Sequence, residues 1–152
     1  MKVMFICTGN ICRSAMAEAM LKDEIKKNKE LKEKIEVYSA GTFANTGEGS
    51  TYSAIEVMKE YGIDLTSHKA TNVRESDIKQ MDIILCATVS HKSMIIRMYP
   101  ELKDKTYTIK EFVGEKRDLD IKDPWGYDVE IYRFCASEIK KCIDLIISKC
   151  YN

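Results

Sequence analysis

Short apolar runs alternate with amphipathic stretches along most of this chain. Four runs indicate buried strands, at residues 3–6, 35–39, 81–87 and 106–109. Apolar positions at helical spacing predict helices at residues 14–28, 51–60, 75–80 and 90–98, and from 128 onward. Strands that alternate with helices are typical of a parallel sheet with helices on both faces. We therefore predict a single α/β domain over residues 1–152, built on a four-stranded parallel sheet.

The size and composition narrow the class of protein. A chain of 152 residues supports one well-buried core and is too short for two ordinary domains. With 45% hydrophobic and 32% charged residues, the composition is that of a globular protein. Lys and Arg together number 24, as do Asp and Glu, so no net charge attracts nucleic acid or membranes. Without an apolar membrane span or a signal-peptide pattern, we expect a cytoplasmic protein with neither type of partner.

The six cysteines favour reduced thiols over a disulfide framework in such a composition. Cys135, Cys142 and Cys150 recur at helical spacing in the last helix, and we expect them to fill the core. Cys7 and Cys12 are not spaced as a zinc-binding pair, and the two histidines stand apart. We expect no metal site.

Residues 7–14, Cys-Thr-Gly-Asn-Ile-Cys-Arg-Ser, concentrate the chemistry of the chain between the first strand and the first helix. At such a turn, free backbone N–H groups and the helix dipole both favour an anion. Cysteine reacts as the thiolate, which helix N-termini and cations stabilise, and the arginine fork matches two phosphate oxygens. We interpret this stretch as a phosphate-binding loop in which Cys7 attacks phosphorus while Arg13 and the loop amides hold the phosphoryl oxygens.

The other loop residues have expected roles as well. We expect Gly9 to allow a positive φ and a close approach to the anion, and Asn10 tolerates the same region. Ser14 is expected to cap the helix and to donate its hydroxyl toward Cys7. The phosphate-binding set is therefore Thr8, Gly9, Asn10, Ile11, Cys12, Arg13 and Ser14. Because Arg13 and the amides supply the positive field, we expect no cofactor.

The run from Phe5 to Ser14, followed by Met16-Ala17-Glu18, resembles the low-molecular-weight protein tyrosine phosphatase family. That family has one domain of about this size, so the resemblance covers essentially the whole chain. Ala15 departs from the family, which usually has proline there. Because proline only pre-organises the first helical turn, the change should cost little.

The resemblance also assigns supporting residues. Ser39, at the end of the second strand, matches a family serine that bonds the loop asparagine, here Asn10. His68 matches a histidine that braces the same asparagine. Cys12 matches a cysteine that pairs reversibly with the nucleophile and guards it against oxidation. We expect His91 to be exposed or to cap the fourth helix.

Asp123-Pro124-Trp125-Gly126, just ahead of the last helix, resembles the family's general-acid loop. On this basis Asp123 protonates the leaving oxygen and then activates the water that hydrolyses the phosphocysteine. Trp125 is a candidate aromatic wall for the substrate. Asp118 and Asp120 are competing acids, without the proline that would hold them.

The substrate depends mainly on Ile11, which we expect at the rim of the loop. An apolar branched side chain suits a flat aromatic ring. The related protein arginine phosphatases usually have threonine there, yet residues 39–44 and 109–113 resemble that branch. Tyrosine-specific relatives place an aromatic wall about where Asn45 stands, and Phe43 is the available substitute. We predict a protein phosphatase acting on phosphotyrosine and releasing inorganic phosphate, with phosphoarginine as the alternative.

Two functions of other classes are less favoured. Thioredoxin-linked arsenate reductases share the Cys-Thr-Gly-Asn loop but need two further cysteines about seven apart after the third strand. Cys86 matches one of them, whereas Ser93 stands where the other would be. A silent phosphate-binding module would not need Cys7, Arg13 and Asp123 together.

Overall fold

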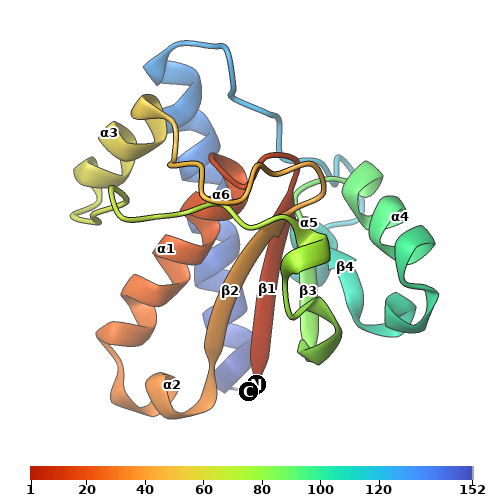
Figure 1. Cartoon of the computed structure of the whole chain (residues 1–152). Helices are drawn as coiled ribbons and strands as arrows, with labels where there is room; N and C mark the ends of the chain where they lie inside the picture. Colours follow the sequence, from red (N-terminus) through yellow and green to blue (C-terminus); the bar gives the residue numbers. More distant parts are fainter. Residues whose placement is uncertain (152) are drawn as a thin grey trace.

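A four-stranded parallel sheet forms the centre of the computed structural model, which describes residues 1–151. The strands are β1 (Lys2–Cys7), β2 (Glu36–Gly41), β3 (Ile83–Cys86) and β4 (Thr106–Thr108). Their order across the sheet is β2-β1-β3-β4, and each neighbouring pair is parallel. Figure 1 shows the carboxyl ends of β1 and β2 at the upper edge, opposite both chain ends. The predicted α/β fold is confirmed.

The register of the sheet brings the ends of the strands together. Cys7 at the end of β1 pairs with Gly41 at the end of β2. On the other side, Ile6 pairs with Cys86, which pairs in turn with Thr108. Ligands of parallel α/β sheets bind at this edge, because the loops that follow the strands converge there. The segment after Cys7 therefore lies where such a site is expected.

Helices cover both faces of the sheet, as predicted. The α-helices are α1 (Arg13–Lys26), α2 (Lys29–Lys34), α3 (Tyr52–Glu60), α4 (Val89–Met98), α5 (Ile109–Phe112) and α6 (Val129–Tyr151). Three 3₁₀ helices, η1 (Val73–Glu75), η2 (Ile78–Gln80) and η3 (Pro100–Lys105), complete the described elements. The helices α1 and α6 pack against each other on one face, with α3 beside α6, and α4 packs with η3 on the other (Figure 1).

Alternation along β1 divides the core into two layers. Val3 and Phe5 point into the cluster formed with α1 and α6, whereas Met4 and Ile6 point into the cluster formed with α4 and the 3₁₀ helices. Successive side chains of a strand point to opposite faces, so a strand buried on both sides is apolar at every position. This explains why β1 was recognisable as a continuous apolar run.

The short helices differ most from the sequence prediction. The segment between the predicted helix at 14–28 and the predicted strand at 35–39 forms α2, whose N-cap Asn28 accepts the backbone N–H groups of Glu30 and Leu31. The predicted helix at residues 75–80 consists of η1 and η2, and residue 109, predicted at the end of the fourth strand, begins α5. These elements each bury only one residue, so apolar periodicity cannot define them.

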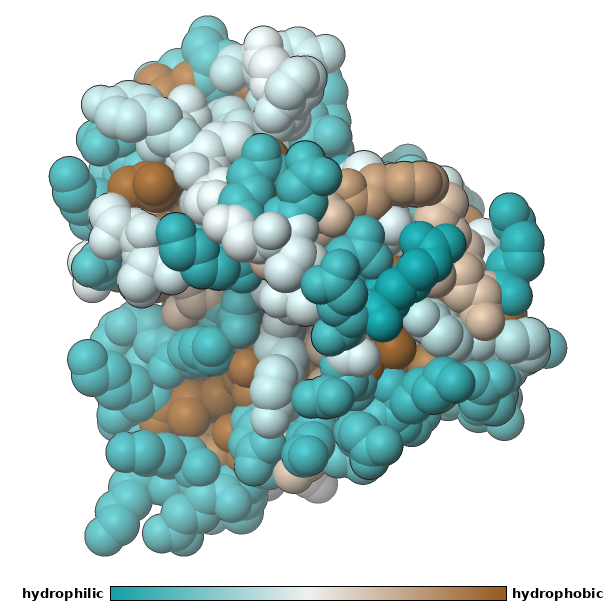
Figure 2. All heavy atoms as spheres, in the orientation of Figure 1, coloured by the Kyte–Doolittle hydropathy of each residue, from teal (hydrophilic) through white to brown (hydrophobic). Residues whose placement is uncertain are grey.

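The surface seen from this side is mainly hydrophilic (Figure 2). Apolar atoms show at the bottom of a hollow between α1 and β2, which Ala15, Ala19 and Tyr38 help to line. Within residues 1–151, no helix is both long enough and apolar enough to span a membrane.

Candidate active site

The predicted phosphate loop surrounds a small cleft at the carboxyl edge of the sheet. The strand β1 ends at Cys7, and α1 begins at Arg13, so the five residues between them form the strand-to-helix turn. The cleft has a volume of about 240 Å³. Its lining consists of Cys7, Thr8, Gly9, Ile11, Cys12, Arg13, Asp123 and Trp125. The structure thus brings a thiol, a guanidinium, a carboxylate and an indole from two distant segments to one place.

Asn10 determines the shape of this turn. Its φ of 58° lies in the left-handed region, and its side chain is fully buried. The side-chain nitrogen donates to Ser14 Oγ at 2.8 Å and to Ser39 Oγ at 2.9 Å, while the side-chain oxygen accepts the backbone N–H of Thr71 at 2.9 Å. These three bonds offset the cost of the left-handed backbone. Gly9 does not have a positive φ, so the expectation for that glycine was wrong.

A second set of contacts braces Asn10 from the side of α1. His68 Nε2 lies 2.7 Å from the Asn10 carbonyl oxygen and therefore carries the proton that it donates. Ser39 donates its hydroxyl to Glu18 Oε1 at 2.6 Å, and the same carboxyl oxygen lies 3.7 Å from His68 Nδ1. The expected contacts of Ser39 and His68 with Asn10 are both present. Sequence reasoning missed Glu18, whose signal is its position one helical turn after Ser14.

Ser14 faces the sulfur of Cys7. Its Oγ lies 2.9 Å from Cys7 Sγ and accepts a hydrogen bond from Asn10, which leaves the hydroxyl proton free to be donated to a Cys7 thiolate. Ser14 does not cap α1, because Cys12 occupies the N-cap position and Ser14 lies within the first turn. The predicted contact with Cys7 is present and the predicted cap is wrong. The Ser14 hydroxyl contacts the Cys7 sulfur instead of a free N–H group at the start of α1.

The side chain of Arg13 is buried and held from the opposite side of the cleft. Its Nη1 donates to the Ile121 carbonyl oxygen at 2.9 Å. Ile121 in turn donates its backbone N–H to the Ala87 carbonyl just after β3, at 2.9 Å. The guanidinium orientation therefore depends on the loop between α5 and α6, which also carries Asp123.

Asp123 is the aspartate of this loop that lines the cleft. Its Oδ2 lies 3.6 Å from Arg13 Nη2, and its Oδ1 accepts the backbone N–H of Trp125 at 3.1 Å. The side chain of Asp123 is 53% exposed, so it is open to solvent. Asp120 is engaged elsewhere, since its Oδ1 accepts the Val89 N–H at the start of α4. Neither Asp118 nor Asp120 belongs to the cleft lining.

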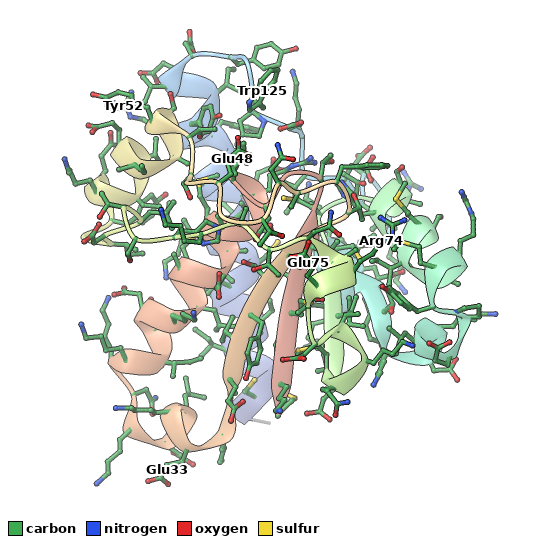
Figure 3. All side chains as sticks on the ribbon, in the orientation of Figure 1. Glu33, Glu48, Tyr52, Arg74, Glu75 and Trp125 are labelled. Atoms are coloured by element: carbon green, nitrogen blue, oxygen red, sulfur yellow. The ribbon has the colours of Figure 1, made fainter. Side chains whose placement is uncertain are left out.

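Two aromatic residues had been expected as substrate walls. Trp125 lines the cleft and remains 63% exposed, at the end of the molecule that also carries Glu48 and Tyr52 (Figure 3). Phe43 is 65% exposed and lies outside the cleft lining. Its backbone N–H is nevertheless bonded to the Thr8 carbonyl at 2.9 Å. The expectation that Phe43 forms a wall is therefore not met in this structure.

Cys12 faces the cleft from the side of α6. Its sulfur lies 3.3 Å from the Tyr132 hydroxyl and 3.7 Å from Thr51 Oγ1. Burial raises the pKa of the Cys12 thiol, so it stays protonated at neutral pH. Cys7 and Cys12 are both free thiols, and a disulfide between them stays a prediction.

His91 is the clearest departure from the sequence expectation. It is only 7% exposed, and the side chain that caps α4 belongs to Thr88. Its Nε2 lies 2.8 Å from Thr8 Oγ1, and its Nδ1 lies 2.8 Å from Thr88 Oγ1. Burial, assisted by the positive charge of Arg13, lowers the pKa of His91 to about 4. No local pattern signals this contact, because it depends on how α4 starts beside the phosphate loop.

Comparisons with known proteins point to one family. The family model for low molecular weight phosphotyrosine protein phosphatase matches residues 2–150. The protein-arginine-phosphatase of Geobacillus stearothermophilus is 40% identical over 148 residues, which cover 97% of this chain and 95% of that protein.

Solved structures are similar over nearly the whole chain. A low molecular weight protein tyrosine phosphatase from T. tengcongensis has a TM-score of 0.87 at 45% identity, covering 98% of this chain and 99% of its own. A YwlE arginine phosphatase mutant with a phosphorylated active-site serine has a TM-score of 0.92 at 32% identity, and the match covers 100% of this chain and 97% of that chain. This chain therefore belongs to the low molecular weight phosphotyrosine protein phosphatase family and is a cysteine-based phosphatase.

Proposed function

We propose that this phosphatase hydrolyses phosphotyrosine in proteins, with Cys7 as the nucleophile. The observation that carries the proposal is the composition of the cleft. Cys7 lies among the loop residues with Arg13, and the apolar Ile11 and Trp125 line the same space. A flat aromatic ring gains from contact with such side chains, while its phosphate reaches the loop.

The first chemical step transfers the phosphoryl group to sulfur. The Cys7 thiolate attacks phosphorus, so that a P–S bond forms as the P–O bond to the tyrosine breaks. Asp123 gives its proton to the departing phenolic oxygen. The phosphoryl oxygens are held by the loop amides and by Arg13, whose orientation is fixed by the Ile121 carbonyl. The Arg13 side chain is thus already oriented for phosphate before a substrate binds.

The second step restores the thiolate. The Asp123 carboxylate takes a proton from a water molecule, and the resulting hydroxide attacks phosphorus. The P–S bond breaks, inorganic phosphate leaves and Cys7 is again an anion. The Ser14 hydroxyl, 2.9 Å from the sulfur, donates to the thiolate as it departs. Asn10 accepts the backbone N–H of Thr71 and donates its side-chain N–H to Ser14 Oγ. These bonds hold the Ser14 hydroxyl in the same direction through both steps.

Phosphoarginine is the second candidate, because the Geobacillus stearothermophilus relative at 40% identity is a protein-arginine-phosphatase. The two candidates differ in what surrounds the phosphate. A tyrosine presents an apolar ring, whereas an arginine presents guanidinium N–H groups that need acceptors. Ile11 provides no acceptor in its side chain, which favours the ring.

Parallel kinetics on one peptide carrying either phosphotyrosine or phosphoarginine test this proposal. We expect kcat/KM to be about tenfold or more higher for phosphotyrosine, the range that one apolar or hydrogen-bonding contact provides. Ile11→Thr should lower kcat/KM for phosphotyrosine and raise kcat/KM for phosphoarginine, so that the ratio narrows. Ile55→Thr, a change outside the cleft, is the control. A wild-type preference for phosphoarginine would overturn the assignment of substrate, though not of the phosphatase chemistry.

We also propose that the protein works in the cytoplasm. The reaction needs Cys7 as a free thiolate, and all six cysteines are free in the structure. A reducing compartment keeps them so. Cell fractionation of the tagged chain checks this, and recovery in an oxidising compartment contradicts it.

A further inference from the structure

A buried imidazole links the rim of the phosphate loop to the start of α4. His91 lies between two threonine hydroxyls, at 2.8 Å from Thr8 Oγ1 and 2.8 Å from Thr88 Oγ1. Thr8 belongs to the cleft lining and is exposed, whereas His91 is 7% exposed. The chemistry assigned so far to the cleft uses neither the Thr8 side chain nor His91.

Thr88 accommodates a neutral form of His91 that carries its proton on Nε2. Thr88 Oγ1 accepts the backbone N–H of His91 at 3.1 Å, as the N-cap of α4. With its hydroxyl proton directed at Nδ1, Thr88 pairs with the tautomer in which that nitrogen is unprotonated. In that neutral form the proton is on Nε2, which donates to Thr8 Oγ1. The Thr8 oxygen becomes an acceptor for His91, and its own proton is left for the cleft.

We propose that His91 is a positioning residue that fixes the Thr8 hydroxyl as a hydrogen-bond donor to the bound phosphoryl ester. This inference rests on the proposed function, since it needs the ester to occupy the cleft above Cys7. The Thr8 hydroxyl thereby donates to the ester in addition to the loop amides and Arg13. Because the acceptor oxygens of the ester are negatively charged, a donor held in place is worth more than a freely rotating hydroxyl.

The surroundings of His91 keep it in the required form. Burial lowers its pKa to about 4, and the positive charge of Arg13 acts in the same direction. The carboxylates of Asp123 and Asp120 oppose this shift but do not reverse it. A neutral ring donates at one nitrogen only, whereas a charged ring would donate at both and turn the Thr88 proton away.

A double-mutant cycle tests the pairing of His91 with Thr8. Thr8→Val removes the hydroxyl while keeping the shape, and His91→Leu removes the nitrogen that directs it. We expect each change to lower kcat/KM for p-nitrophenyl phosphate about tenfold, the loss typical of one hydrogen bond to a charged group. Because both changes remove the same donor, the double variant should be no worse than Thr8→Val alone. Thr66→Val, at an exposed turn, is the matched control.

Two further measurements separate positioning from a merely structural role. His91→Gln keeps an N–H that reaches toward Thr8, so it should recover most of the activity lost in His91→Leu. The ring nitrogens of His91, one of two histidines in the chain, should show the neutral Nε2–H form by nitrogen NMR at neutral pH. Inhibition by inorganic phosphate should weaken in Thr8→Val.

Three results would overturn the inference while leaving the phosphatase assignment intact. The first is an active wild type whose Thr8→Val variant keeps the same kcat/KM. The second is a His91→Leu defect that is equally large in the Thr8→Val background. The third is an Nδ1–H ring in the folded protein. A wild type that does not hydrolyse aryl phosphates would instead reject the proposed function itself.

Discussion

Asn10 shows how much of the site depends on a single residue. Its backbone takes a conformation that costs free energy for any residue other than glycine, and its side chain makes three hydrogen bonds that hold it there. The motif indicated that Asn10 tolerates this region, and the family resemblance indicated that Ser39 bonds it. The choice of Asn10 over Gly9 for the positive φ depends on which peptide faces the cleft, and adjacent residues do not specify that.

Asp123→Asn should slow the first step most for poor leaving groups. An amide cannot give a proton to the departing oxygen, so the rate of phosphoryl transfer from phenolic esters of high leaving-group pKa should fall by about 10²–10⁴. Esters whose leaving oxygen is already a good anion should be affected less. Single-turnover kinetics over a series of aryl phosphates measures this difference.

Asp118→Asn is the matched control for this prediction. Asp118 belongs to the same loop, is exposed, and has a left-handed φ of 50° that asparagine tolerates well. We expect unchanged rates across the series of esters. Equal sensitivity to the leaving group in wild type and Asp123→Asn would reject Asp123 as the acid.

At the scale of elements, the end of β2 supports the phosphate loop. Gly41 pairs with Cys7 in the sheet, and its N–H donates to the Thr71 carbonyl at 2.9 Å. A Cβ placed on Gly41 would collide with the Thr8 carbonyl oxygen and would lie 2.9 Å from the Asn10 nitrogen. Both are backbone atoms of the phosphate loop, so they have no flexible side chain to move aside. The glycine is therefore needed for close packing of strand and loop.

Gly41→Ala should displace the phosphate loop. We expect kcat/KM for p-nitrophenyl phosphate to fall at least tenfold and the free energy of unfolding to drop by about 1–3 kcal/mol, as for other overpacked sites. Gly49→Ala is the control, because a Cβ there meets nothing within 4 Å. Steady-state kinetics and urea unfolding of both variants check this, and a fully active, equally stable Gly41→Ala would refute it.

The elements that sequence could predict are those with a repeated apolar pattern. The strand β1 and the long helix α6 bury a continuous run and a full helical stripe, so both were found close to their observed bounds. The helix α2 buries only Leu31 and depends on its Asn28 cap, so the sequence shows no apolar helical pattern there. Elements built from caps and charges give a weaker signal than elements built from burial.

At the scale of the whole molecule, the site combines segments that are far apart in the sequence. Residues 7–14, Ser39, His68, His91 and Asp123 converge because parallel strands end at one edge. The role of His68 could be predicted from sequence, because its segment resembles the family. The contact between Thr8 and His91 joins positions 83 apart without such a mark, so only the packing of α4 reveals it.

The stability of the whole fold should depend on pH through His91. Its pKa in the folded chain is about 4, against an ordinary value of 6.5. The unfolded chain therefore binds more protons between these values, and the folded state loses stability as the pH falls from about 6.5 to about 4. The loss is at most about 3 kcal/mol, from roughly 1.4 kcal/mol for each pKa unit.

Urea unfolding of wild type and His91→Gln at several pH values measures this effect. We expect the wild type to lose more stability than the variant between pH 6.5 and 4, since the carboxylates titrate in both proteins. Parallel curves for the two proteins would show that His91 does not titrate as described. The same data report whether His91→Gln folds normally, which its use as the rescue variant for His91→Leu also requires.

The most direct test of the account is to trap the phosphoryl group on sulfur. Asp123→Asn should slow hydrolysis of the intermediate, because no carboxylate takes the proton from water. Acid quenching of this variant during turnover of radiolabelled p-nitrophenyl phosphate, whose leaving oxygen needs no proton from Asp123, followed by peptide mapping, locates the label. We predict label on the peptide that contains Cys7, and none in Cys7→Ala/Asp123→Asn on the same timescale. Rapid turnover with no label on Cys7, or label on another residue, would contradict the account.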